Sequence, residues 1–292
     1  MNGILLIDKP AGWTSHDVIA KLRVILREKR IGHTGTLDPM ATGLLVVLVG
    51  RATRAASFAE ADEKKYIAGI RLGVTTDTQD ITGTKLREEE AHVSDEELDR
   101  VLEKFTGEQM QMPPMYSAVK IGGQKLVDAA RKGKEIERTP RKINIYELRR
   151  SVGEGEDPYL YVHCSKGTYV RTLCHDIGEE LGCGACLSFL RRISAGPFSI
   201  VDAYRVGEVN CEAALGAAEE LLLPVDTIFE QYPALTLDAE QERRCRVGAE
   251  FRANAEDGRL RVYSADGEFL ALVEAQNGVV RTVKNFFEID EA

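Results

Sequence analysis

The sequence predicts an α+β fold followed by a small β domain. Apolar, strand-like runs and amphipathic, helix-like runs follow one another without the regular strand–helix alternation of a parallel α/β sheet. From residue 232 to residue 287 the pattern changes to short alternating runs, separated by the turn pairs Asp266-Gly267 and Asn277-Gly278. A chain of 292 residues is long enough for one large domain or two of ordinary size.

The first predicted elements are a buried strand and an amphipathic helix. Residues 4–7 are apolar and stop at a turn that contains proline and glycine. Thr14 and Asp17 have the spacing of a capping box, and apolar residues then recur at helical spacing until Gly32 offers a left-handed stop. The outer face of this helix and the turn after it are basic, and can contact either phosphate or water: Lys21, Arg23, Arg27, Lys29 and Arg30.

A loop punctuated by glycines, residues 32–43, leads into the apolar run 44–49, which predicts a buried strand. That run is the longest apolar stretch and is far shorter than the ~20 residues of a membrane-spanning helix. Neither a membrane span nor an export signal is expected, so we predict a cytoplasmic protein. The remaining elements are predicted as strands at 66–72, 143–152 and 159–164, and helices at 94–105, 125–131 and 172–181.

The charge is unevenly distributed along the chain. The net charge is −9, from 38 basic and 47 acidic residues, which by itself argues against a polyanionic partner. The acidity is concentrated in residues 87–100 and 206–242, whereas residues 120–150 hold ten bases and four acids. A basic face can therefore coexist with an acidic back, and charge alone leaves RNA binding and an ordinary solvated surface equally open.

The six cysteines are expected to be thiols, because the chain is long and shows no regular cysteine framework. Cys183 and Cys186 have the spacing of a zinc half-site, with Cys174 and His175 nearby. A structural zinc site needs a second, closely spaced pair of ligands, and adjacent residues supply that poorly. We therefore favour buried cysteines over a metal site.

Asp38 lies in the glycine-punctuated loop. The loop lacks the Gly-Lys-Ser/Thr ending of a P-loop and the Gly-x-Gly-x-x-Gly pattern of dinucleotide sites. What remains is a carboxylate on a tight turn, followed by a proline. For the loop by itself, a structural turn is favoured over a catalytic role.

Tyr169 and Arg171 follow the predicted strand 159–164, where Gly167 interrupts the chain before a helix. An arginine can hold a carboxylate ionised through two hydrogen bonds, and a tyrosine ring can stack on a base. Each is also an ordinary strand residue. Tyr66 follows the basic pair Lys64-Lys65, and Leu190 precedes Arg191-Arg192. Singly, none of these residues assigns a function.

Taken in order, these motifs resemble the tRNA pseudouridine-55 synthases of the TruB family. The resemblance extends over most of the first 200 residues, and the C-terminal part is only loosely similar to the PUA-type RNA-binding domain of that family. The motifs that carry it are Leu5-Leu6-Ile7-Asp8-Lys9-Pro10, Gly32-His33-Thr34-Gly35-Thr36-Leu37-Asp38-Pro39-x-Ala41-Thr42-Gly43, Lys65-Tyr66, Arg71-Leu72-Gly73, Thr76-Asp77-Thr78-x-Asp80, Pro114-Met115-Tyr116-Ser117-Ala118-Val119-Lys120, residues 166–172 and Leu190-Arg191-Arg192.

The resemblance implies isomerisation of one uridine in the T-arm loop of tRNA, without a cofactor, a metal or an obligate protein partner. It implies an α+β catalytic domain, residues 1–231, with a mixed, largely antiparallel sheet flanked by helices, and a β-barrel-like PUA-type domain, residues 232–292. By position, Asp38 is the nucleophile, Arg171 pairs with it, and Tyr66 stacks on the target base and can assist proton transfer.

The resemblance also implies four supporting residues. Tyr169 and Leu190 line the pocket, His33 fills the space that the flipped nucleotide leaves, and Lys9 supports the catalytic loop. A base inside a folded RNA loop must be extruded before it can react, at a cost of a few kcal/mol, and aromatic stacking offsets part of that cost.

Two other functions remain open from the residues alone. A nucleoside hydrolase would use Asp38 and a second carboxylate to cleave the glycosidic bond with water. A non-enzymatic RNA-binding module would rest on residues 120–150 and the C-terminal β domain. The pair Asp77 and Asp80 lacks the glycine and distal glutamate of a calcium loop, so we assign it to loop capping.

Overall fold

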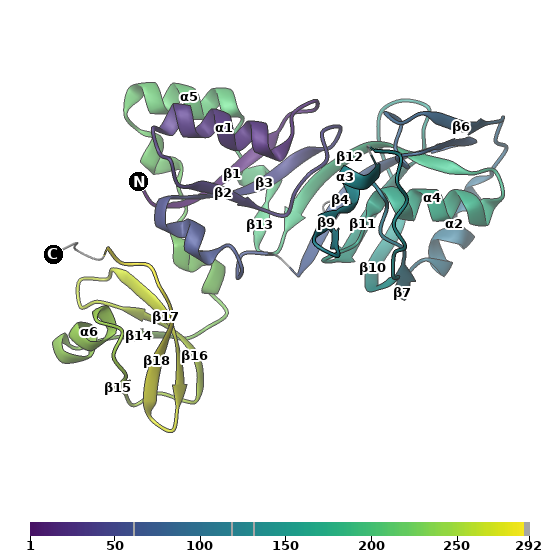
Figure 1. Cartoon of the computed structure of the whole chain (residues 1–292). Helices are drawn as coiled ribbons and strands as arrows, with labels where there is room; N and C mark the ends of the chain where they lie inside the picture. Colours follow the sequence, from purple (N-terminus) through teal and green to yellow (C-terminus); the bar gives the residue numbers. More distant parts are fainter. Residues whose placement is uncertain (61, 118, 131, 289–292) are drawn as a thin grey trace.

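A long mixed sheet joins the two halves of the main body of the computed structural model (Figure 1), which describes residues 1–60, 62–117, 119–130 and 132–288. The strand order is β1-β3-β12-β4-β11-β10-β7, with β2 also paired to β3 and β13 to β12. These strands are β1 (Gly3–Lys9), β2 (Ile31–Thr34), β3 (Thr42–Val49), β4 (Glu63–Leu72), β7 (Gly107–Gln111), β10 (Arg141–Ser151), β11 (Tyr159–Ser165), β12 (Ala185–Ala195) and β13 (Phe198–Ser199).

The two halves of this sheet meet at a narrow seam between β3 and β12. The seam consists of two residue pairs, Thr42 with Arg191 and Gly43 with Arg192, and it is parallel. The other strand pairs of the sheet are antiparallel, which confirms the predicted α+β class with a largely antiparallel sheet.

The N-terminal half carries α1 (Ser15–Leu26) and α5 (Val206–Leu215) on one face of β1, β2 and β3 (Figure 1). The capping box predicted at Thr14 and Asp17 is present, with both reciprocal hydrogen bonds formed. The helix ends earlier than predicted, because Arg27 and not Gly32 takes the left-handed conformation, with φ 50°. The predicted loop therefore begins with a strand, β2, which places His33 on the sheet.

Strand β3 is buried on both faces, as its continuous apolar sequence predicts. Leu45 and Val47 pack with α1, whereas Leu44 and Val46 pack in a second cluster on the opposite face. The loop that contains Asp38 leads directly into β3, so this buried strand fixes the C-terminal end of the loop.

The second half carries α2 (Asp95–Lys104) and α4 (Val170–Leu181) against one face of β4, β10 and β11 (Figure 1). Helix α4 begins two residues before the predicted start at 172, so Arg171 lies in its first turn and not on a strand. The smaller elements of this half are β5 (Val74–Thr76), β6 (Lys85–Glu88), β8 (Lys120–Ile121), β9 (Gln124–Lys125) and α3 (Leu126–Ala130).

The C-terminal part forms a separate five-stranded sheet in the order β14-β16-β17-β18-β15 (Figure 1). The predicted turn at Asn277 and Gly278 is confirmed: both residues have positive φ, 52° and 74°, as a tight hairpin requires. The elements are β14 (Ala234–Thr236), α6 (Ala239–Arg246), β15 (Phe251–Arg252), β16 (Gly258–Tyr263), β17 (Phe269–Gln276) and β18 (Val279–Asn285). Helix α6 was not predicted, because its sequence is almost wholly polar.

Aromatic side chains join the C-terminal sheet to the main body. Phe229 lies in the 3-10 helix η4 (Val225–Phe229), and its ring packs 5.9 Å from Phe269 and 5.6 Å from Phe286, measured between centroids. The other 3-10 helices are η1 (Gly50–Ala55), η2 (Ile200–Asp202) and η3 (Ala218–Leu221). Within the described residues, no helix has the length and apolar character that crossing a bilayer demands.

Two helical glycines give a matched test of how tightly α4 packs on the sheet. A Cβ added at Gly178 would overlap the backbone of Ala185 in β12, whereas one added at Gly207 in α5 would meet nothing within 4 Å. We expect Gly178→Ala to destabilise the protein by ~1–3 kcal/mol through overpacking. Gly207→Ala should stabilise it by up to ~1 kcal/mol, because alanine favours the helix. Thermal unfolding of the two variants should give shifts of opposite sign; a higher Tm for both would contradict this close packing.

Candidate active site

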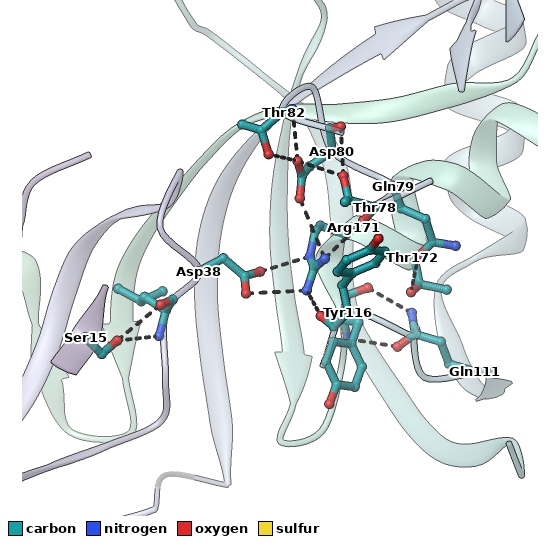
Figure 2. A network of polar contacts seen from close by, with 12 residues as sticks. Ser15, Asp38, Thr78, Gln79, Asp80, Thr82, Gln111, Tyr116, Arg171 and Thr172 are labelled. Atoms are coloured by element: carbon teal, nitrogen blue, oxygen red, sulfur yellow. Dashed lines mark hydrogen bonds and ion pairs between the residues drawn. The ribbon is translucent and has the colours of Figure 1, made fainter. Parts of the chain in front are cut away.

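Asp38 lies in the loop between β2 and β3, beside the seam where the two halves meet. Contacts with Ser15 and with the backbone of Arg192 help to hold this loop. Ser15 of α1 donates to the carbonyl of Leu37 and accepts from its N–H, at 3.1 and 2.9 Å (Figure 2). At the other end, Gly43 approaches the backbone of Arg192 so closely that no side chain would fit.

Lys9 is fully buried beneath the same loop. Its Nζ donates to the carbonyl of Pro39 at 3.3 Å, to that of Pro10 at 2.9 Å and to that of Trp13. Burial lowers the pKa of Lys9 from 10.5 to about 8, and the negative charge of Asp38 opposes that shift. Lys9 therefore ties the chain directly after Asp38 to β1, while it does not line the cavity described below.

Arg171 binds Asp38 from the other half of the molecule. Its Nε lies 2.9 Å from Oδ2 of Asp38, and its Nη2 lies 3.4 Å from Oδ1 (Figure 2). The arginine side chain is only 5% exposed, whereas that of Asp38 is 38% exposed. Arg171 also donates to the carbonyls of Thr78, at 3.0 Å, and Tyr116, at 2.7 Å. The guanidinium is thus fixed on several sides, and the carboxylate it holds remains open to a ligand.

Burial raises the pKa of the Asp38 carboxyl above its ordinary value of 3.8. The positive charge of Arg171 opposes this shift, and the negative charge of Asp80 adds to it. Without Arg171 the carboxyl would therefore be harder to ionise, which gives the ion pair a direct effect on nucleophilicity.

Asp80 is a site residue that the sequence analysis missed. Its Oδ2 lies 3.6 Å from Nη1 of Arg171, and its Oδ1 accepts from the N–H of Thr82 and the hydroxyl of Thr78, both at 3.0 Å (Figure 2). The predicted loop capping is present, but Asp80 also shares the guanidinium with Asp38. No local signal in the sequence distinguishes Asp80 from Asp77, which caps the N–H of Thr84 at 2.7 Å.

A cavity of about 230 Å³ opens in front of Asp38. This is smaller than the ~300–1,000 Å³ typical of drug-sized ligands and suits a smaller guest. Tyr66 on β4 and Leu190 on β12 form one wall, because Leu190 pairs with Ala68, two residues along the same face from Tyr66. Tyr169, at the start of α4, also lines the cavity.

His33 lies outside this cavity lining, although it is close to the loop. It is half-buried on β2, and its ring centroid lies 6.5 Å from that of His16 on α1. Burial lowers the pKa of His33 below 6.5, and the nearby positive charges of His16 and Arg192 add to this effect. The structure therefore brings five of the seven predicted residues around one cavity and places His33 and Lys9 next to it.

Arg192 is a second residue that the sequence analysis did not single out. It is 1% exposed, and it donates from Nε to the carbonyl of Leu44 at 2.7 Å and from Nη2 to that of Gly35 at 2.8 Å. Its positive charge lies near the phenol of Tyr66 and opposes the effect of burial on the pKa of that group. Burial raises the pKa of Tyr66 to about 12, so the phenol is neutral near pH 7. Arg192 thus connects the loop, the seam and the cavity wall.

Comparison with known proteins assigns the family. A family model described as "TruB family pseudouridylate synthase (N terminal domain)" matches residues 23–170, and one described as "tRNA pseudouridylate synthase B C-terminal domain" matches residues 171–230. A Clostridium kluyveri protein named tRNA pseudouridine synthase B is 38% identical over 294 residues, which cover 98% of this chain and all of that protein. A protein of the same name from Azoarcus sp. is 42% identical over 285 residues, or 96% of this chain and 93% of that one.

Solved structures agree in fold. A chain from a crystal structure titled as a Cbf5–Nop10–Gar1 complex superposes with a TM-score of 0.74 at 26% identity, covering 98% of this chain and 85% of that one. A chain from a structure titled as an H/ACA RNP bound to a substrate RNA gives the same TM-score at 24% identity, covering 99% and 86%, and shows likeness of fold. The family models and the named relatives place the chain among the pseudouridylate synthases. More narrowly, the chain belongs to the TruB family.

The shared guanidinium can be tested with the two aspartates of one loop. We expect Asp80→Asn to lower the turnover rate by ~10-fold or more, because Arg171 loses the second charge that orients it. Asp77→Asn is the matched control, since Asp77 caps Thr84 and has no contact with Arg171. Single-turnover rates on a tRNA substrate, with thermal unfolding in parallel, make the comparison. Equal rates for the two variants would mean that Asp80 serves the loop alone.

Proposed function

We propose that this protein isomerises the uridine at position 55, in the T-arm loop of tRNA, to pseudouridine. The observation that carries the proposal is the carboxylate of Asp38, held by Arg171 and open to a small cavity walled by Tyr66 and Leu190. This arrangement occurs in a chain of the TruB family, whose named relatives are tRNA pseudouridine synthases. The chain is therefore an enzyme, an isomerase that acts on RNA.

The cavity is suited to a nucleotide that has left its stack. Flipping a base out of a folded RNA loop costs a few kcal/mol, and stacking on an aromatic ring recovers ~1–3 kcal/mol. Tyr66 supplies the aromatic ring and Leu190 an apolar contact. Tyr169, the N-cap residue of α4, also lines the cavity. His33 lies beside the loop and not in the cavity, and we propose that it occupies the space that the flipped nucleotide leaves in the RNA.

Asp38 acts as the nucleophile. The glycosidic bond from ribose C1′ to N1 of uracil breaks, the base rotates, and a bond from C1′ to C5 forms. C5 loses a proton and N1 gains one, so the product keeps the mass of the substrate. The carboxylate can attack either uracil C6 or ribose C1′, and in both routes Arg171 favours its ionised form. The reaction is redox-neutral and uses side chains alone, so it needs no cofactor or metal.

The proposal extends to domains, partners and location. Residues 1–231 form the catalytic domain and residues 232–292 a PUA-type RNA-binding domain, and the change from the long sheet to the five-stranded sheet supports this division. We propose no obligate protein partner. A cytoplasmic location follows from the proposed substrate and fits six free thiols.

The surface that contacts RNA phosphates is better placed on α1 than on residues 120–150. Arg131 of that stretch, like Ala118 of the adjoining motif, lies outside the described residues, and four other basic residues of the stretch are ion-paired: Arg138, Lys142, Arg149 and Arg150. In contrast, the side chains of the basic residues of α1 and its following turn form no ion pair within the described part of the chain. They are Lys21, Arg23, Arg27, Lys29 and Arg30. Their helix begins at Ser15, which hydrogen-bonds Leu37 next to Asp38.

Replacement of the nucleophile tests the function itself. We expect Asp38→Asn to bind tRNA with nearly the affinity of the wild type and to make no pseudouridine, because the amide cannot form the adduct. The measurement is tritium release from tRNA labelled at C5 of uridine, alongside a binding titration. A nucleoside hydrolase would release free uracil, which chromatography of the wild-type reaction detects. A pure RNA-binding module would show no product with either protein.

The cations near α1 should set the salt dependence of binding. We expect Lys21→Gln combined with Arg30→Gln to weaken tRNA binding and to reduce the slope of log Kd against log salt by about 1 for each phosphate that is no longer neutralised. The control is Lys85→Gln combined with Lys142→Gln, which removes the same charge from residues paired with Glu88 and Glu108. If the two double variants had the same slope, net charge and not this surface would govern binding.

A further inference from the structure

Gln111 forms two hydrogen bonds with the main chain at the N-terminus of α4. It is the last residue of β7 and is 4% exposed. Its side-chain Nε2 donates to the carbonyl of Tyr169 at 3.0 Å, and its Oε1 accepts from the N–H of the same residue at 2.8 Å (Figure 2). The amide thus satisfies both backbone groups of one residue, as a neighbouring strand would.

Tyr169 is a position where the helix needs outside support. It is the N-cap residue of α4, and it has the extended backbone of a cap but makes no side-chain capping bond. Its carbonyl also accepts the first bond of the helix, from the N–H of Leu173 at 3.0 Å. Gln111 therefore fixes the residue from which α4 starts, and Arg171 follows two positions later in the first turn.

The segment that follows Gln111 contacts Arg171 directly. The carbonyl of Tyr116 accepts from Nη2 of Arg171 at 2.7 Å, and that nitrogen also faces Oδ1 of Asp38 at 3.4 Å. One stretch of chain, residues 111–116, thus holds the backbone beside Arg171 at one end and the guanidinium at the other. Small shifts of either contact change the alignment of Arg171 with Asp38.

We propose that Gln111 is a positioning residue, which holds Tyr169 and Arg171 in the orientation that Asp38 requires. The role needs an amide, because one of its ends must donate and the other must accept. The inference rests on the proposed function, because its effect is measured as turnover. Gln111 belongs to none of the sequence motifs described above. Gln111 touches neither the cavity nor Asp38, so it acts through the residues it orients.

The decisive variant is Gln111→Glu, compared with Gln111→Met. An ionised carboxylate at position 111 can accept from the N–H of Tyr169 but places negative charge against its carbonyl. At neutral pH we expect kcat to fall by ~10- to 100-fold, with KM and the T-arm Kd within about threefold of the wild type. A protonated carboxyl offers one donor and one acceptor, as the amide does. The ratio of Gln111→Glu to wild-type kcat should therefore rise as the pH falls, whereas the ratio for Gln111→Met should stay constant.

The charged groups around position 111 affect where this recovery occurs. Arg141 lies opposite on β10 and Arg171 lies on α4, and both favour the ionised carboxylate, while burial and the charge of Asp38 beyond Arg171 oppose it. Taking the ratio at each pH removes the part of the Asp38 titration that the proteins share, and Gln111→Met, which adds no charge, shows that shared part alone. A constant ratio for Gln111→Glu, or an unchanged kcat at neutral pH, would overturn the inference.

A control and a second readout separate this role from general stability and from the proposed function. Gln109→Glu changes the same residue type on the same strand, where the side chain donates to the carbonyl of Phe105 at 2.7 Å, and should retain the wild-type kcat.

The Nε–H resonance of Arg171 in ¹⁵N NMR reports its contact with Asp38 without any turnover. It should shift in Gln111→Glu and not in Gln109→Glu. An unshifted resonance refutes the positioning role, whereas a shifted resonance in a protein that makes no pseudouridine refutes only the proposed function.

Discussion

The rest of the site depends on one buried guanidinium shared between two carboxylates. Taking a charge out of water costs several kcal/mol unless it is paired and hydrogen-bonded, and Arg171 meets both conditions. Asp38 and Asp80 supply the negative charge, and the carbonyls of Thr78 and Tyr116 accept the remaining N–H groups. These partners come from three separate loops. The arginine therefore selects one arrangement of several loops, and that arrangement leaves one face of Asp38 open.

Much of the fold could be predicted from local patterns. The capping box at Thr14, the two-sided burial of residues 44–49 and the hairpin turn at Asn277 each follow from a few neighbouring residues, and each is present in the structure. The errors were also local. A left-handed arginine ended α1 where a glycine was expected, and α6 was missed because it lacks an apolar face.

The site could be predicted only in part. Asp38, Tyr66 and Arg171 stand out through motifs, and the fold brings them to one cavity. Asp80 and Arg192 also lie in motifs, but their importance, like that of Gln111, comes from contacts between residues far apart in sequence. A buried arginine that binds carbonyls, or a glutamine that pairs with a distant backbone, leaves no periodic trace in the chain. Residues of this kind require a structure.

The narrowness of the seam has a mechanical consequence. Asp38 belongs to one half of the long sheet and Arg171 to the other, while only two residue pairs join β3 to β12. Arg191 with Asp8, and Arg192 with Leu44, stiffen this joint from the same strand. A rotation of one half against the other would change the alignment of Asp38 with Arg171, because each half holds one member of this ion pair. A bound polymer that contacts both halves and turns one against the other would therefore change the strength of the ion pair between Asp38 and Arg171.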